Sequence, residues 1–96
     1  MSIARELEAL RAEIDVCDDQ IRHLIDQRIN LVRTIATLKV SAGSTMHDSD
    51  RETRILQRTD GVECEIERRL LHDVYASIFK SGKRLWDAAV RTTPQA

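Results

Sequence analysis

The sequence predicts an all-α protein with three helices: one long, one short and one long. Composition is the first indication, because only three of the 96 residues are aromatic, three are glycine and one is proline. Strand-favouring and turn-forming residues are therefore scarce. The second indication is an apolar stripe with helical spacing that runs through the first 38 positions. The third is a similar pair of stripes near the end of the chain.

The first helix is expected over about residues 2–40, a stretch that no glycine or proline interrupts. Its stripe advances in alternating steps of three and four residues, so it forms one face of the helix. We call it the heptad stripe; it comprises Ile3, Leu7, Leu10, Ile14, Cys17, Ile21, Leu24, Arg28, Leu31, Ile35 and Leu38. Such a helix is about 55 Å long, whereas a compact globule of this length has a radius of gyration of only about 13 Å. We expect about half of the stripe to be bare in a monomer, and a second copy of the chain to cover it.

The second helix is expected to be short. Gly43 ends the first helix within a polar loop over residues 41–45. The next helix then begins near Asp48 or Ser49 and ends near Arg58. Ser49, followed three residues later by Glu52, fits a capping box. A turn is predicted over residues 59–61.

The third helix is expected to begin between residues 62 and 65 and to end near Val90. It carries two apolar stripes, which indicates burial on two sides. The first stripe is Ile66, Leu70, Val74, Ser77, Ser81, Leu85 and Ala88. The second stripe is Tyr75, Phe79, Gly82, Trp86 and Val90. Residues 1–91 thus form one domain, and residues 92–96 are predicted to be a disordered tail.

Charge and hydropathy exclude several classes of function. The net charge is −1, from 15 basic and 16 acidic residues, and nucleic-acid-binding domains usually show a clear basic excess. No stretch approaches the roughly 20 apolar residues that span a bilayer, so no membrane partner is expected. The N-terminus is charged at once, without an apolar signal core, and we expect a cytoplasmic protein. Cys17 and Cys64 lack metal-site spacing, and we expect Cys17 in the core and no disulfide.

Arg28 is the charged member of the heptad stripe. A guanidinium cannot lose its proton, so a buried one needs an anion beside it. Lys39 follows eleven residues later, three helical turns on, and points the same way. Arg51 stands in the first turn of the second helix, where the helix dipole disfavours a cation. These cations predict a pocket for a small polyanion; the alternative is that Arg28 pairs with a partner's carboxylate and Lys39 extends into water.

In their order and spacing, these residues resemble the AroQ class of chorismate mutases. The resemblance covers essentially the whole chain and implies all-helical, intertwined homodimers with shared active sites. The segments that carry it are Leu10-Arg11-Ala12-Glu13-Ile14-Asp15, Asp18, Asp26-Gln27-Arg28, Ile35-Ala36-Thr37-Leu38-Lys39 and Asp48-Ser49-Asp50-Arg51-Glu52. The family's reaction is the rearrangement of chorismate to prephenate, an isomerisation in the shikimate pathway of aromatic amino acid biosynthesis that needs no cofactor or metal.

The resemblance also implies a role for each charged residue. Arg11 reaches into the partner's pocket and holds one substrate carboxylate, while Arg28 holds the other within its own chain. Lys39 donates to the ether oxygen whose bond to carbon breaks. The remaining roles fall to three residues of the second helix: Arg51 adds positive charge, Glu52 accepts from the ring hydroxyl, and Asp48 lies at the pocket edge.

Two residues of the third helix depart from the family pattern. Aligning Ile78 and Phe79 with the family's apolar pair places Trp86 where the family has a glutamine, and Gly82 where a serine is common. Trp86 either donates its indole N–H to the substrate, with Gly82 making space, or belongs to the core and the alignment is displaced by one turn.

The departures leave several functions open. The chain is a chorismate mutase, a mutase of 4-amino-4-deoxychorismate in an aminophenylalanine or antibiotic pathway, or an isochorismate pyruvate-lyase with the same fold. A non-catalytic helical dimerisation module is the alternative of a different class. Small mutases of the family sometimes depend on a larger enzyme, so an activating partner enzyme also stays possible.

Overall fold

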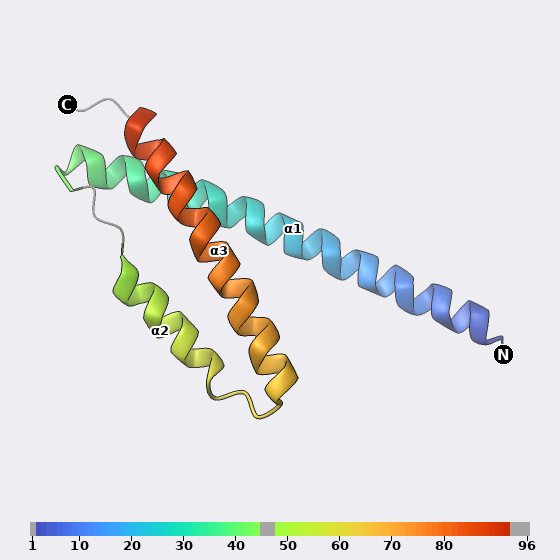
Figure 1. Cartoon of the computed structure of the whole chain (residues 1–96). Coiled ribbons are helices and arrows are strands. Elements are labelled where there is room, and N and C mark those ends of the chain that lie inside the picture. The colour runs from blue at the N-terminus through green and yellow to red at the C-terminus, as the bar shows by residue number, and fades with distance from the viewer. Residues whose placement is uncertain (1, 45–47, 93–96) are drawn as a thin grey trace. The chain divides into compact units, whose positions relative to one another are not determined.

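The computed structural model describes residues 2–44 and 48–92, and this part of the chain forms three helices (Figure 1). They are α1, Ile3–Ser41; α2, Ser49–Thr59; and α3, Glu65–Thr92. The predicted all-α class and its long, short, long order are confirmed, and the helix ends agree with the prediction within one or two residues. Thr92, predicted to start the tail, is instead the last residue of α3. The rest of the predicted tail lies outside the described residues.

The chain divides into two compact units, Met1–Leu31 and Val32–Ala96, which are described separately. The first unit is the N-terminal part of α1, and its side chains from residue 2 to residue 27 are all exposed. Large apolar members of the heptad stripe are among them; Leu7 is 45% and Leu24 61% exposed. Cys17, expected in the core, is exposed and free as well. In a single chain all the apolar members of the heptad stripe are therefore exposed, whereas about half of the stripe was expected to be bare.

In the second unit, the core forms where the last turns of α1 meet α3. Ala36 and Val40 are the buried residues of α1, and Phe79, Gly82 and Trp86 are those of α3. Burying a phenylalanine-sized side chain contributes roughly 1.5–3 kcal/mol. The α3 residues of this core, Phe79, Gly82 and Trp86, belong to the second predicted stripe, so the predicted burial of this stripe is confirmed at its centre.

The packed face of α1 is not the heptad stripe. Ala36 is fully buried, whereas Leu38, a stripe residue two positions later, is 64% exposed. Successive residues turn by about 100° around a helix, so these side chains point in nearly opposite directions. The other stripe of α3 is open too, because Ile66, Leu70 and Val74 are exposed. The sequence identified both apolar faces of α3, but only one is covered within the chain.

The end of α1 is fixed by Gly43. Its φ of +80° lies in the left-handed region that favours glycine. The Ser44 N–H donates to the Lys39 carbonyl at 2.7 Å, and the Gly43 N–H donates to the Val40 carbonyl at 3.0 Å. This pair of bonds is the Schellman motif, which satisfies carbonyls that the helix leaves without intrahelical donors. The predicted helix stop is confirmed, and it fixes the backbone of Lys39.

The cap of α2 differs from the prediction. Asp48 rather than Ser49 is the N-cap, and its Oδ1 accepts a hydrogen bond from the Arg51 backbone N–H at 3.0 Å. Both residue types are strong N-caps, so the pattern alone did not decide between neighbours. Ser49 becomes the first residue of the helix, and its carbonyl accepts from the Thr53 hydroxyl.

Replacing the cap is expected to weaken this unit. Asp48→Ala should lower the free energy of unfolding by about 1 kcal/mol, because the Arg51 N–H loses its acceptor. Ser49→Ala is the matched control and should change it by less than about 0.5 kcal/mol. Urea denaturation at one fixed protein concentration measures both. A larger loss of stability for Ser49→Ala than for Asp48→Ala would instead support Ser49 as the N-cap.

Candidate functional site

Lys39 occupies the last turn of α1 and is half-buried. Its ammonium lies over the ring of Trp86, with 5.3 Å between the Nζ atom and the ring centroid. Contacts of this kind, within about 6 Å, contribute about 0.5–2 kcal/mol. The C-terminal end of a helix also favours a cation. The end of α1 thus presents a positive charge against an aromatic face of α3.

Trp86 is part of the core of the second unit and is only 5% exposed. Gly82, one turn earlier on the same face of α3, is also buried. Phe79 continues this face and stacks on Tyr75 with a centroid distance of 5.9 Å. The interpretation of Trp86 as a core residue predicts this burial, and the choice between that interpretation and a contact with the substrate stays a prediction. Its contact with Lys39 was not anticipated.

The first turn of α2 carries the other charged residues predicted in this unit. Asp48 is exposed, and its side chain is engaged with the backbone of the turn. Arg51 is exposed, whereas the neighbouring Glu52 is half-buried. Asp48 caps the helical turn that carries the side chains of Arg51 and Glu52. It therefore influences the positions of these side chains through the backbone.

Arg11 and Arg28 belong to the first unit. Arg11 lies on the exposed stretch of α1. Arg28 is half-buried and is the first of the described residues along the chain that is not exposed. Arg28 is therefore partly withdrawn from solvent, as expected of a cation on an apolar stripe, although the apolar members of the stripe in this unit remain exposed.

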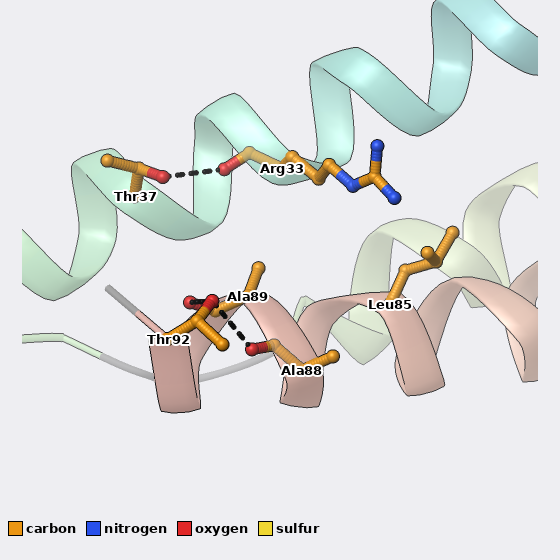
Figure 2. Close-up of a pocket in the computed structure, with 6 residues that line it drawn as sticks. All are labelled: Arg33, Thr37, Leu85, Ala88, Ala89 and Thr92. Atoms are coloured by element: carbon orange, nitrogen blue, oxygen red, sulfur yellow. Dashed lines mark hydrogen bonds between the residues drawn. The ribbon is translucent and has the colours of Figure 1, made fainter.

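A shallow pocket of about 320 Å³ lies between the last turns of α1 and α3, and none of the predicted site residues lines it. Figure 2 shows its six lining residues, which are Arg33, Thr37, Leu85, Ala88, Ala89 and Thr92. The hydroxyl of Thr37 donates to the Arg33 carbonyl at 3.0 Å, and that of Thr92 donates to Ala88 at 3.0 Å. Thr37 precedes Lys39 by two residues, which corresponds to about 200° around the helix. The pocket therefore opens on another side of α1, and both of its hydroxyls are engaged by their own helices.

The described residues contain no group of three or more His, Cys, Asp or Glu side chains that could hold a metal ion. Within the same part of the chain, no helix combines the length and the apolar character needed to cross a bilayer.

The contact between Lys39 and Trp86 is the feature of the site that sequence reasoning missed. Periodicity reports which residues share a face of one helix, and these two stand on different helices. The available signal was the resemblance, which implies that Lys39 and the residue at the Trp86 position serve the same substrate. That signal indicated proximity and gave no indication that the ring face would meet the ammonium.

Comparisons with known proteins agree with the resemblance. The family model described as chorismate mutase type II matches residues 10–85. A bifunctional chorismate mutase/prephenate dehydratase from Aquifex aeolicus (strain VF5) is 32% identical over 74 residues, or 77% of this chain. The match covers 18% of that relative, so the chain spans about a fifth of its length. No solved structure gives a significant match. The matched span of the family model includes every predicted site residue except Trp86, before which it ends.

Proposed function

Because the chain belongs to the chorismate mutase type II family, a family of isomerases, we propose that it catalyses the rearrangement of chorismate to prephenate. The observation that carries the proposal is the extent of the family match. It spans all six charged residues of the predicted site: Arg11, Arg28, Lys39, Asp48, Arg51 and Glu52. The half-buried Lys39, held at the end of α1, gives the proposal a structural centre.

The reaction requires only that the protein orient the substrate and place positive charge beside its ether oxygen. Within one substrate molecule the ether C–O bond breaks and a C–C bond forms, without a nucleophile or a proton acceptor. The flexible dicarboxylate must be held with its enolpyruvyl arm over the ring, which supplies part of the rate. Negative charge builds up on the ether oxygen, and fixed cations beside that oxygen supply much of the rest. Arginine and lysine side chains on rigid helices are suited to both tasks.

The residues divide between these two tasks. We assign the two substrate carboxylates to the guanidiniums of Arg28 and of Arg11 from a partner chain, since guanidiniums bind carboxylates with two parallel hydrogen bonds. Lys39 donates to the ether oxygen. Arg51 adds positive charge, and Glu52 accepts from the ring hydroxyl. Asp48 supports Arg51 and Glu52 by capping α2. Its hydrogen bond from the Arg51 backbone N–H is consistent with this role.

A homodimer completes the proposal. The exposed heptad stripe supports it, because stable monomers rarely leave so long an apolar surface in water. Leu10, which immediately precedes Arg11, is 55% exposed on this stripe. A second chain packed on the stripe would bring Arg11 close to a site other than its own. The relative is named as a mutase and a dehydratase in one protein. This name supports a further proposal, in which the present chain works together with an enzyme or domain that consumes prephenate.

A second candidate substrate is 4-amino-4-deoxychorismate. The observation that favours it is Trp86, which stands where the family's glutamine is expected and lies beyond the matched span. Glu52 pairs with an ammonium group even better than with a hydroxyl, because both partners are then charged.

Steady-state kinetics on three substrates in parallel distinguish these candidates. We expect the purified chain to convert chorismate to prephenate with the highest kcat/KM. Faster conversion of the amino analogue would move the assignment to the second candidate. Release of pyruvate from isochorismate would move it to a lyase. A folded, helical protein that turns over none of the three would contradict the proposed function and favour a dimerisation module.

A further inference from the structure

We propose that the pocket between the last turns of α1 and α3, shown in Figure 2, binds a small aromatic monocarboxylate with a hydroxyl or amino group at the far end of its ring. This site is additional to the predicted catalytic one, because none of the predicted site residues lines it. The charge, hydrogen bonding and shape of the six lining residues carry the proposal, which does not rest on the proposed function.

One end of the pocket is positively charged. Arg33 is the only ionisable residue among the six that line it. Among the described residues its guanidinium finds no hydrogen-bond or ion-pair partner, and Figure 2 shows it on the side of the pocket where Leu85 lies. A guanidinium binds a carboxylate through two parallel hydrogen bonds. A ligand therefore places its carboxylate at this end.

The two threonines lie toward the opposite end of the pocket in Figure 2, and their side chains accept hydrogen bonds there without donating any. The hydroxyl of Thr37 donates to the Arg33 carbonyl at 3.0 Å. That of Thr92 donates to the carbonyls of Ala88 and Ala89, at 3.0 Å and 3.3 Å. A hydroxyl has one hydrogen, so only oxygen lone pairs are left for a ligand. These lone pairs attract an O–H or N–H group and repel a carboxylate.

The surface between the two ends is apolar and flat. Figure 2 shows Ala88 and Ala89 there, and each contributes only a methyl group. The volume of about 320 Å³ is at the lower end of the range of about 300–1,000 Å³ for small-molecule sites. A single aromatic ring is flat enough to cover the two methyl groups and small enough for this volume. Its two substituents then meet the guanidinium and the threonine oxygens.

This polarity distinguishes the ligand from the proposed substrate. The substrate is a dicarboxylate, for which the proposed function provides two guanidiniums. The pocket offers one guanidinium, on Arg33, and a second carboxylate would meet the lone pairs of Thr37 and Thr92. The pocket is therefore not a second copy of the substrate site.

NMR titration of the isotope-labelled full chain with 4-hydroxybenzoate tests the proposal. We expect saturable shifts of the backbone amides of the lining residues, with a Kd of about 1 mM, as is ordinary for about ten non-hydrogen atoms. Benzoate lacks the far donor and 4-hydroxybenzamide lacks the charge, and each should bind about 3- to 10-fold more weakly. Benzene-1,4-dicarboxylate should also bind more weakly than 4-hydroxybenzoate, although it carries more negative charge.

Two variants assign the ends of the ligand. Arg33→Met should weaken the binding of 4-hydroxybenzoate by about 3- to 10-fold. Arg91→Met is the matched control, since Arg91 is an exposed cation of α3 that does not line the pocket, and it should stay within about twofold. Thr92→Val keeps the shape of the side chain without its oxygen. It should reduce the advantage of 4-hydroxybenzoate over benzoate, a coupling that isolates the contact at this end.

Several results would overturn the inference. Absence of saturable shifts at millimolar concentrations would remove the site, and equal affinities of the natural chain and Arg33→Met would remove the role of the guanidinium. Tighter binding of the dicarboxylate would contradict the accepting end. Shifts confined to Lys39 and the first turn of α2 would place the ligand at the predicted catalytic residues instead. None of these results bears on the proposed function, which is measured by turnover of chorismate without the added ligand.

Discussion

Replacing Lys39 with methionine is expected to lower kcat for chorismate by about 10²–10³-fold while leaving the chain folded. Losing one donor aimed at a developing negative oxygen costs about this much in enzymes that stabilise such a charge. Methionine keeps the length and the helix preference of the lysine. The backbone of residue 39 continues to accept the Ser44 N–H, because that bond uses its carbonyl.

The matched control for Lys39 is Arg33→Met. Arg33 is an exposed cation on the same helix, six residues earlier, and it lines the pocket that contains none of the predicted site residues. Its replacement should leave kcat within about twofold, as for most surface substitutions away from a site. Steady-state kinetics and far-ultraviolet circular dichroism of both variants make the comparison. If Lys39→Met stays within about threefold of the natural protein, Lys39 has no part in the chemical step. An equal loss of kcat in Arg33→Met would show that activity depends on the overall positive charge of α1 rather than on Lys39 itself.

Arg28→Ala is expected to lower kcat/KM by at least about 10³-fold. A bidentate pair between guanidinium and carboxylate provides both binding and orientation, and misplacing one end of a flexible substrate removes much of the advantage of proximity. The variant should stay helical. If Arg28 were only a structural ion pair, Arg28→Leu would instead raise stability without lowering turnover. Kinetics and denaturation of both variants distinguish the two.

Mixing inactive variants tests whether Arg11 and Arg28 serve one site from two chains. Arg11→Ala and Arg28→Ala should each be nearly inactive as homodimers. When equal amounts are unfolded and refolded together, half of the dimers carry one chain of each kind, and one of their two sites has both arginines. The mixture should then recover about a quarter of the natural activity, as expected for random pairing in a twofold dimer. A mixture that stays inactive would contradict the shared site.

The sequence predicted the helices well because their signals are local. Gly43 marks the end of α1, and the structure shows the left-handed backbone that this position requires. The cap of α2 was predicted one residue late, because Asp48 and Ser49 are both good caps and only the backbone geometry distinguishes them. Local chemistry thus placed an element within a residue or two without fixing its terminal hydrogen bond.

Which apolar face is covered could not be predicted from periodicity. The heptad stripe and the packed face of α1 are different faces of one helix, since the adjacent residues Ile35 and Ala36 belong to the stripe and to the core respectively. Periodicity shows that a face is apolar, whereas the partner that covers it depends on how the helices pack. The same limit applies to the site, where the sequence suggested both Lys39 and Trp86 but gave no sign of the contact between them.

The most direct test of the central claim is the rate at which the purified chain consumes chorismate, with the product identified by NMR. The account predicts prephenate as the product and a kcat in the range of about 1–10² s⁻¹, as is ordinary for enzymes. Consumption no faster than in buffer alone, by protein that melts cooperatively and is helical, would contradict it.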